Sequence, residues 1–280
     1  MPDNPVIPST KTLPEDLKPC LVPKSWGDLH ELCFADSWND SLRRYRSPFV
    51  FRGVGHSTDI LETSLMRLGG PYLKLERHLL RNFRKYAHQD WVDENSVWHW
   101  LAVAQHHGLP TRLLDWTYSP LVALHFATEA LDDFENDGLV WKVNYQLAAR
   151  LLPESLGRRL REEGSNVFTE EILGEMLDSL DALERLPEKG AILFYEPASL
   201  DDRIVNQFAL FSLLVRADLP VSAILRHHPE LYERILIPAQ MKWEIRDKLD
   251  QSNITERVLY PGLDGVCRWL KRQYSSRMDL

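Results

Sequence analysis

Cysteine is scarce in this chain, which has Cys20, Cys33 and Cys267 among its 280 residues and no two of them close together. An odd and scattered set excludes a disulfide framework, and it also excludes a zinc site built from pairs of thiolates. The N-terminus lacks a basic start followed by an apolar run, so we expect no signal peptide. These absences together predict a protein of the reducing cytoplasm.

Long apolar runs and an excess of positive charge are missing as well. No apolar stretch reaches the roughly 20 residues that a helix needs to cross a bilayer, so no membrane-spanning segment is predicted. The formal net charge is -8, which argues against general attraction to nucleic acid, although arginines cluster locally at Arg43, Arg44, Arg46 and Arg52. Hydrophobic residues make up 44% of the chain, which is typical of a globular protein.

The order of sequence signals predicts one main domain. Residues 1–24 contain six prolines among mixed polar residues, which favours an extended N-terminal arm. Residues 25–275 are interpreted as a single domain with a Glu-, Arg- and Leu-rich helical insertion at about 146–187. Helical patterns alternate with β-prone runs, so the prediction is an α+β fold in which helices surround small mixed or antiparallel sheets. The β-prone runs are 49–51, 138–143, 191–195 and 208–215.

Arg52 stands at the end of the first β-prone run and is followed by Gly53. An arginine at a strand end can make a two-pronged contact with a phosphate or a carboxylate, and Gly53 would let a ligand approach the backbone. The alternative is an arginine that pairs with a carboxylate of the core.

Glu76 falls on a predicted buried stripe of the helix that begins after Pro71. A buried carboxylate needs a partner, and Arg52 and Arg112 are the candidates. The alternative is a glutamate at the margin of the stripe that reaches water. The stripe consists of Leu73, Glu76, Leu80, Phe83 and Ala87.

The run from Gln105 to Thr117 is the densest in chemically active side chains, and it joins two predicted helices through a loop. Loops held by rigid elements commonly carry function, so His106 or His107 could act as a general acid or base. The alternative is a buried polar network that ties the junction together. A zinc site is also conceivable, but its spacing matches no standard pattern. The residues for it would be His99, His106, His107 and Asp115.

Thr117 and Ser119 stand immediately before the next predicted helix, which begins at Pro120. The unpaired N–H groups of a helix N-terminus form a site for an anion such as a pyrophosphate. Capping by Ser119 explains the same residues without a ligand, and both interpretations can hold together.

These residues together resemble the FRG domain, a mostly bacterial and phage-associated family named for its Phe-Arg-Gly motif. The resemblance spans about residues 45–270, although 145–190 contributes no motif. The matching pieces are Phe51-Arg52-Gly53, Glu76 with Phe83, the runs 100–117 and 119–127, Arg203-Ile204-Val205-Asn206-Gln207 with Phe211, and the run 259–265.

A more distant similarity is to ADP-ribosyltransferases of the Arg-Ser-Glu type, which have a split sheet. That family ends its first strand with an arginine, often as aromatic-Arg-Gly, and Phe51-Arg52-Gly53 resembles this element. A Ser/Thr-rich strand then runs into an Ala-x-x-Phe-Ala helix, and the runs 117–119 and 123–127 are similar to it. A catalytic glutamate comes last in the family, but this chain has Gln207 there, which can hydrogen-bond a ribose hydroxyl but cannot remove a proton.

The resemblance implies a domain that binds NAD or a related nucleotide and transfers or hydrolyses its ADP-ribose part, with a macromolecule as one kind of acceptor. It implies catalytic roles for four residues: Arg52, Glu76, His107 and Gln207. It implies contacts with the cofactor for six: Arg52, Gly53, His106, Arg112, Thr117 and Ser119. No metal is implied. Two alternatives remain, a nucleic-acid-directed enzyme or module that grips phosphates through Arg52, Arg67 and Arg112, and a non-enzymatic domain that binds a protein partner.

Overall fold

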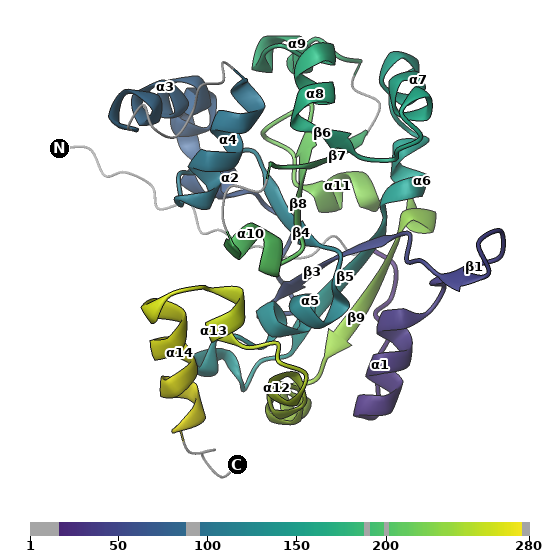
Figure 1. The fold of residues 1–280 in the computed structure, drawn as a ribbon, viewed down its shortest axis with the longest axis vertical. Coiled ribbons are helices and arrows are strands. Elements are labelled where there is room, and N and C mark those ends of the chain that lie inside the picture. Colours follow the sequence, from purple (N-terminus) through teal and green to yellow (C-terminus); the bar gives the residue numbers. More distant parts are fainter. Residues whose placement is uncertain (1–16, 88–95, 188–190, 199–201, 276–280) are drawn as a thin grey trace, which may run out of the picture.

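A seven-stranded sheet forms the centre of the computed structural model, which describes residues 17–87, 96–187, 191–198 and 202–275 (Figure 1). Neighbouring strands are antiparallel except for the first two, which are parallel. In spatial order the strands are β6 (Phe168–Thr169), β7 (Ile192–Glu196), β8 (Ala209–Leu214), β4 (Leu114–Thr117), β3 (Phe49–Val54), β5 (Gly138–Asn144) and β9 (Tyr232–Ile237). A separate hairpin consists of β1 (Trp38–Asn39) and β2 (Arg44–Tyr45).

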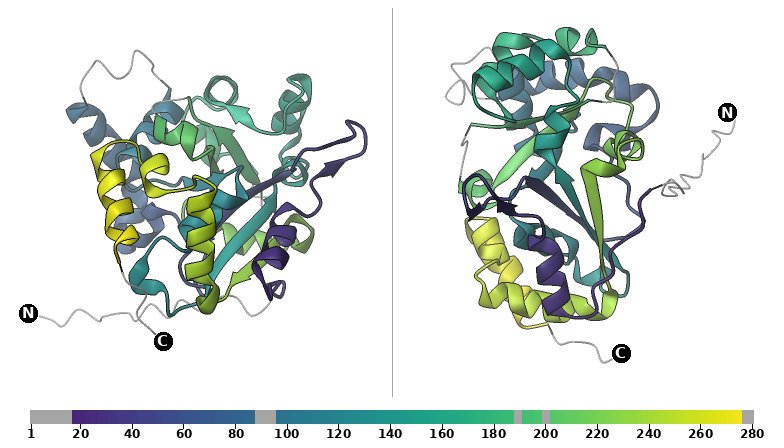
Figure 2. Two further views of the ribbon diagram at one scale, coloured as in Figure 1. Left: turned by 60° about the horizontal axis from the view of Figure 1, so that its bottom comes forward. Right: turned by 90° about the vertical axis from the view of Figure 1, so that its right-hand side faces the viewer.

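Helices gather around both halves of this sheet (Figures 1 and 2). The first group, beside the β6-β7-β8 half, comprises α2 (Ser64–Leu68), α3 (Glu76–Tyr86), α4 (Val97–His106), α6 (Tyr145–Ala149), α7 (Glu154–Glu162), α8 (Glu170–Met176), α9 (Leu180–Glu184), α10 (Asp202–Asn206) and α11 (Val221–Leu225). The second group, around the β3-β5-β9 half, comprises α1 (Trp26–Phe34), α5 (Pro120–Ala127), α12 (Lys242–Gln251), α13 (Glu256–Leu259) and α14 (Leu263–Gln273). The predicted α+β class is confirmed.

The sheet has a weak joint at its centre. Strand β3 pairs with β5 along six residue pairs, but in the described chain it pairs with β4 only through Phe51 and Thr117. The two strands separate beyond this pair, so the sheet consists of two halves held together at one point. This joint positions the site described below, because side chains on either side of it face the space between the strands.

Local signals explain where several helices begin. Ser25, Ser96 and Ser119 each accept a hydrogen bond from the backbone N–H three residues later, which satisfies one of the unpaired donors at the start of α1, α4 and α5. The start of α5 at Pro120, with Ser119 as its cap, agrees with the sequence prediction. On α3, Glu76 and Leu80 are buried and Phe83 is half-buried, so this part of the predicted stripe, including the carboxylate, faces the core.

The segment 17–24 is extended and lies against the edge strand β9. Leu21 donates to the carbonyl of Arg234 (2.7 Å) and accepts from the N–H of Leu236 (2.9 Å), while the Lys18 N–H donates to the Tyr232 hydroxyl. Its polar backbone groups therefore cover part of a sheet edge that would otherwise be exposed. The rest of the predicted arm, 1–16, lies outside the described residues.

The segment 146–187 is largely helical but also contributes the short strand β6. Its leucines join Trp98 and Leu101 of α4 in one hydrophobic cluster, and the Trp98 indole donates to the carbonyl of Leu177 (2.6 Å). Burial of this many apolar side chains makes the segment a part of the core rather than an appendage.

The C-terminal helices are tied to α5 by buried charges. Arg246 of α12 donates to His125 Nδ1 (2.8 Å) and to Glu256 (2.6 Å), and Arg272 of α14 donates to the same glutamate. Because all four side chains are at least 95% buried, the cluster fixes α12, α13 and α14 against the half of the sheet that carries β3. None of the helices in the described ranges is long and apolar enough to span a bilayer.

Candidate functional site

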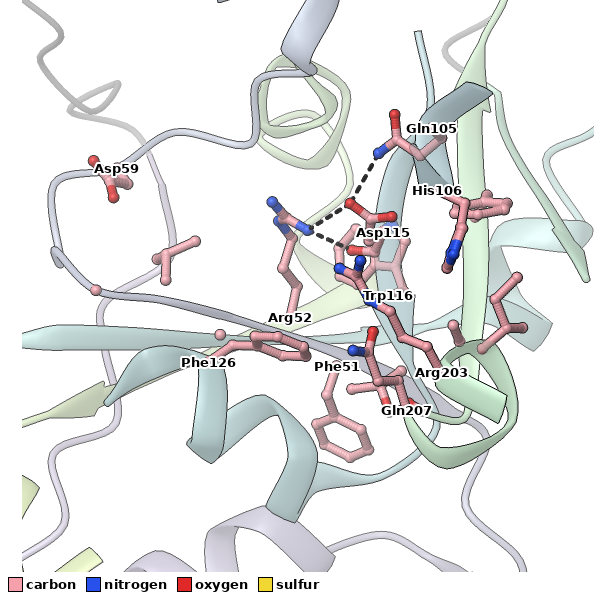
Figure 3. A pocket seen from close by; sticks show the side chains of 17 residues that line it. Phe51, Arg52, Asp59, Gln105, His106, Asp115, Trp116, Phe126, Arg203 and Gln207 are labelled. Atoms are coloured by element: carbon pink, nitrogen blue, oxygen red, sulfur yellow. Dashed lines mark hydrogen bonds and ion pairs between the residues drawn. The ribbon is translucent and has the colours of Figure 1, made fainter. Parts of the chain in front are cut away.

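A pocket of about 360 Å³ opens at the joint between β3 and β4 (Figure 3). Strand β3 contributes the run 51–54, β4 contributes the run 115–117, and the end of α4 contributes Gln105 and His106. The opposite wall comes from Phe126 of α5 and from α10 and the start of β8. Its size lies near the lower end of the range for ligand pockets, so one half of a dinucleotide would fill it.

Arg52 bridges the two strands where they separate. Its Nη1 donates to the backbone carbonyl of Asp115 (2.7 Å) and lies 3.8 Å from Oδ2 of the same residue. The guanidinium therefore satisfies the Asp115 carbonyl on β4, which a backbone N–H of β3 would have satisfied if the two strands were paired there. Within the described chain these contacts use Nη1 alone, which leaves Nε and Nη2 for a ligand.

Charge and solvent act on Arg52 in opposite directions. Desolvation lowers the pKa of the Arg52 guanidinium, and the nearby carboxylates of Asp115 and Asp59 raise it again. The group stays protonated at neutral pH because a guanidinium does not lose its proton in proteins. Partial burial of a permanent cation makes the pocket favourable for an anion.

Asp115 is held from the other side by the end of α4. Gln105 Nε2 donates to Asp115 Oδ2 (3.0 Å), and Gln105 Oε1 accepts from the Thr111 hydroxyl (2.6 Å). The Asp115 side chain is nevertheless 53% exposed. It is therefore a positioned carboxylate that remains open to the pocket.

The wall opposite Arg52 carries a second guanidinium, that of Arg203. It belongs to α10 and stacks on the ring of Tyr260, with 5.1 Å from its Cζ to the ring centroid. Figure 3 shows the side chain extending from α10 across the pocket toward the side of Arg52 and Asp115. Gln207 lies below it, with its Nε2 donating to the carbonyl of Leu259 (2.9 Å). These contacts join the wall to α13 and the segment that follows it.

Gly53 lies in the pocket wall, but packing is what requires it. A Cβ at this position would stand 1.8 Å from the backbone oxygen of Ala123, so only glycine lets α5 approach β3 this closely. The expected role of giving a ligand access to the backbone is therefore secondary to helix packing.

Thr117 and Ser119 are committed mainly to the fold. The Thr117 hydroxyl donates to the carbonyl of Gln207 (2.7 Å) and accepts from the N–H of Ser119 (3.0 Å). Ser119 accepts from the N–H of Val122 as the cap of α5. Thr117 lines the pocket, whereas Ser119 does not. The alternative of plain capping therefore describes Ser119.

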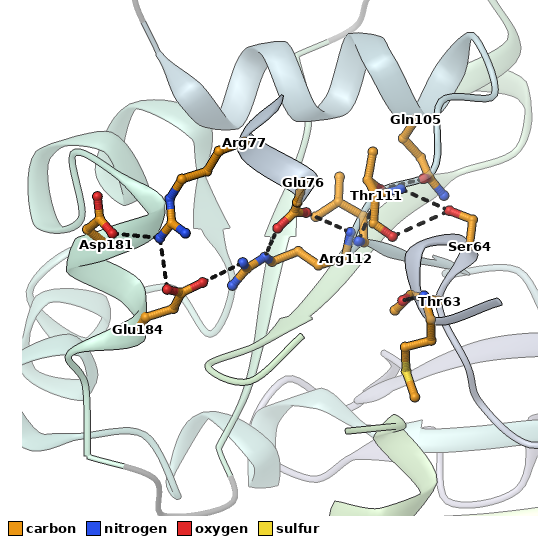
Figure 4. A network of polar contacts seen from close by, with 11 residues as sticks. Thr63, Ser64, Glu76, Arg77, Gln105, Thr111, Arg112, Asp181 and Glu184 are labelled. Carbon is orange, nitrogen blue, oxygen red and sulfur yellow. Dashed lines mark hydrogen bonds and ion pairs between the residues drawn. The ribbon is translucent and has the colours of Figure 1, made fainter. Parts of the chain in front are cut away.

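Glu76 and Arg112, both predicted for the site, lie outside the pocket in a buried network (Figure 4). Arg112 donates to Glu76 through its N–H (2.9 Å) and through Nε (2.6 Å), and its Nη2 donates to Glu184 (2.7 Å). The predicted partner of Glu76 is therefore Arg112 and not Arg52. Both oxygens of the carboxylate accept from the same arginine, so it is not available to a ligand in the pocket.

The two neighbouring histidines separate at the end of α4. His106 lines the pocket, while His107 is exposed at the C-cap, where its ring packs against Phe83 with 6.3 Å between centroids. His99 is buried and its Nδ1 lies 2.9 Å from Glu170. In the residues that the structure describes, no three His, Cys, Asp or Glu side chains are grouped to hold a metal ion.

Residues 47–136 match the family model of the FRG domain. The chain contains an FRG domain. No curated protein and no solved structure matched the chain. The matched segment holds Arg52, His106 and Asp115 of one wall and Phe126 of the other.

The FRG segment does not complete the sheet or the pocket by itself. Its two long strands, β3 and β4, share one residue pair, and the partners that extend both, β5 and β8, lie beyond residue 136. Arg203 and Gln207 close the pocket from outside the matched range. The chain after the FRG segment is therefore needed to build the site.

Several pocket residues, Arg203 and Phe126 among them, were not among the site residues predicted from the sequence, and Asp115 was named only for a conceivable zinc site. These three stand inside quoted motifs: the dense run 105–117, the run 203–207 and the helix 123–127. Asp59 also lines the pocket, and no motif in the sequence indicated it.

Proposed function

We propose that the pocket binds NAD or a related nucleotide and that the domain transfers or hydrolyses its ADP-ribose part. The observation that carries this proposal is the pair of arginines, Arg52 and Arg203, on opposite walls of one pocket that also contains the ring of Phe126. Two guanidinium groups suit a diphosphate, because each can donate two parallel hydrogen bonds to phosphate oxygens. An aromatic face suits a base or a nicotinamide ring.

The polar side chains of the pocket fit the remaining parts of such a ligand. Gln207 and Gln105 carry amides that hydrogen-bond ribose hydroxyls, and both are held by other protein groups. His106 can donate or accept at the same wall. The bound nucleotide supplies the labile bond between nicotinamide and ribose.

Asp115 takes the place of the glutamate that the sequence lacks at Gln207. Its carboxylate is fixed by Arg52 and Gln105 yet remains half exposed, so it can accept the proton of an attacking water or acceptor hydroxyl. Its negative charge also favours positive charge on the ribose carbon as the nicotinamide bond breaks. The acceptor is water in hydrolysis and a nucleophile of a macromolecule in transfer.

Calorimetry with NAD tests the proposal. The wild type is expected to bind at millimolar concentration or tighter, and Arg52→Ala is expected to weaken binding at least about tenfold, because a charge-assisted hydrogen bond contributes roughly 1.5–3 kcal/mol. Arg52→Lys keeps the charge but loses the two-pronged geometry, so it should fall between them. Arg158→Ala is the control, because this arginine lies on α7 with a side chain 63% exposed.

No binding of NAD or ADP-ribose by the folded wild type at millimolar concentration contradicts the proposal. If the protein instead binds nucleic acid with an affinity that falls steeply with salt and depends on Arg52, then the alternative that this pocket binds nucleic-acid phosphates is favoured. We also propose that the protein works in a bacterial cytoplasm, because the family that it resembles is mostly bacterial and because the chain has few cysteines.

A further inference from the structure

The hairpin β1-β2 stands apart from the rest of the molecule. Figure 1 and the left view of Figure 2 show it projecting from the body of the protein between α1 and the start of β3. It forms its own two-stranded sheet and does not join the seven-stranded one. A hairpin of this size contributes little stability of its own, so its surface is not explained by the core.

Large apolar side chains of this hairpin face solvent. Trp38, Leu42 and Tyr45 are 49%, 57% and 71% exposed. Trp38 and Tyr45 are directly opposite each other in the register, and their rings meet edge to face with 5.1 Å between centroids. Because opposite residues share one face of a hairpin, the two rings form a single aromatic surface.

The same hairpin concentrates positive charge. Arg43, Arg44 and Arg46 are exposed, and among the described residues none of them lies within salt-bridge distance of a carboxylate. Elsewhere arginines commonly have such partners, as Arg77, Arg159 and Arg272 do. The chain as a whole carries a net charge of -8, so this is a local basic surface on an acidic protein.

We propose that this hairpin is a binding site for single-stranded nucleic acid. Bases would stack on Trp38 and Tyr45, and the three arginines would contact the phosphates, which is how strands are bound without sequence preference. A membrane fits less well, because the tip places Asp40 and Ser41 beside Leu42, and a polar tip does not insert into a bilayer.

This site is separate from the pocket and goes beyond the function proposed for it. The hairpin precedes the start of β3, whereas the pocket is lined by the far end of that strand. The first pocket residue, Phe51, follows Tyr45 of the hairpin by six residues, which in extended chain span up to about 20 Å, so a ligand at one place need not touch the other. Failure of NAD binding would therefore leave the hairpin proposal intact, and the reverse also holds.

Fluorescence anisotropy of a labelled 15-nucleotide oligothymidylate, titrated with the full chain, tests the proposal. Neutralisation of three phosphates predicts that the affinity falls about 20-fold between 50 and 200 mM salt. Replacing all three arginines, as Arg43→Gln, Arg44→Gln and Arg46→Gln, should remove most of this salt dependence. Trp38→Ala with Tyr45→Ala should weaken binding about tenfold or more at constant salt, because stacking is lost. These side chains are exposed, so both variants should melt as the wild type does.

The matched control carries Arg158→Gln, Arg161→Gln and Arg226→Gln, which change the net charge equally at exposed sites away from the hairpin. It should bind the oligonucleotide nearly as the wild type does. Equal loss in the control, an unchanged salt dependence in the hairpin variant, or no wild-type binding at 100 µM protein overturns the proposal. Hairpin-dependent binding to phosphatidylserine vesicles, or hairpin-dependent dimerisation, in place of oligonucleotide binding would also overturn it.

Discussion

Two polar clusters that share the run 105–117 differ in how completely their charges are satisfied. In the buried network, Glu76 accepts from the backbone N–H and from Nε of Arg112, and Nη2 of that arginine reaches Glu184, so that only its buried Nη1 has no hydrogen-bond partner in the described chain. At the pocket, Arg52 contacts Asp115 through one nitrogen, and the carboxylate remains 53% exposed. The first cluster is closed and the second is open.

This difference separates structural charge from charge available for function. Arg112 and Asp115 are three residues apart in sequence, yet one is buried against its partner and the other faces a cavity. A buried charge needs a charged partner, whereas a partly exposed charge can keep donors and acceptors for a ligand. Residue type alone does not show whether a charge is structural or available to a ligand, because this depends on where its partners lie in the fold.

Arg112→Met is the strongest test of the closed cluster. It leaves the Glu76 carboxylate buried with the backbone N–H of residue 112 but without its charged partner, so we expect a loss of roughly 3–5 kcal/mol in the free energy of unfolding and a melting temperature lower by about 10 °C. Thermal denaturation followed by circular dichroism measures it. The double variant Arg112→Met with Glu76→Leu should recover part of the loss, since no charge is left buried.

Arg77→Met is the control for that variant. Arg77 contacts Glu184 from the exposed side of the same network, with a side chain 46% exposed, so less than about 1 kcal/mol should be lost. A melting temperature of Arg112→Met within 2 °C of the wild type would show that the network is not a structural element.

Asp115→Asn tests the open cluster. The amide keeps an oxygen for Gln105 but removes the charge, so we expect NAD to bind within threefold of the wild type while nicotinamide release slows at least about 100-fold, the lower range for loss of a general base. Chromatography of the released nicotinamide measures the rate. Asp59→Asn alters the other pocket carboxylate and should slow the reaction less; an unchanged rate in Asp115→Asn removes this residue from the chemistry.

Much of the fold was predictable because its signals are local. The Ser119 cap and the β-prone runs predicted the start of α5 and the strands β3, β5, β7 and β8 to within a few residues. The hairpin strands, with two residues each, are too short to show alternation. The joint at Phe51 and Thr117 could not be predicted either, because it is a pairing between segments far apart in the chain.

Some of the residues that line the pocket could be predicted, although from separate motifs. Arg52, His106 and Thr117 were predicted and do line one pocket together with Gln207. Glu76 was correctly predicted to need a partner, but the sequence left Arg52 and Arg112 as equal candidates. Only the packing of α3 against the 105–117 run decides between them.

His125→Gln extends the comparison to the closed cluster under α5. Burial lowers the pKa of His125 to about 3, with Arg246 adding to the shift, so the folded protein keeps it neutral at pH 5 while the unfolded chain takes up a proton below about 6.5. Stability should therefore fall as the pH is lowered, by about 2 kcal/mol between pH 7 and pH 5 from this group. Urea denaturation at both pH values measures it.

The glutamine variant should lose that part of the pH dependence, because its amide accepts from Arg246 without titrating. Burial raises the pKa of Glu256, but its hydrogen bond with Arg272 and the charge of Arg246 outweigh this and hold the pKa at about 2. Glu256 therefore begins to lose its stabilising charge only below about pH 4.5, outside the range of this measurement. The exposed His107→Gln serves as control, and an equal change there would mean that His125 is not the origin.

Ser119→Ala has the smallest expected effect and decides between the two interpretations of the α5 N-terminus. The serine caps the helix through the N–H of Val122 and does not line the pocket, so its loss should cost about 1 kcal/mol of stability and leave the NAD affinity unchanged. Calorimetry and thermal denaturation of the same preparation measure both. If the NAD affinity falls tenfold while the stability does not change, then the start of α5 binds the ligand. The charges and hydroxyls available to the ligand would then include Ser119 as well as Arg52 and Asp115.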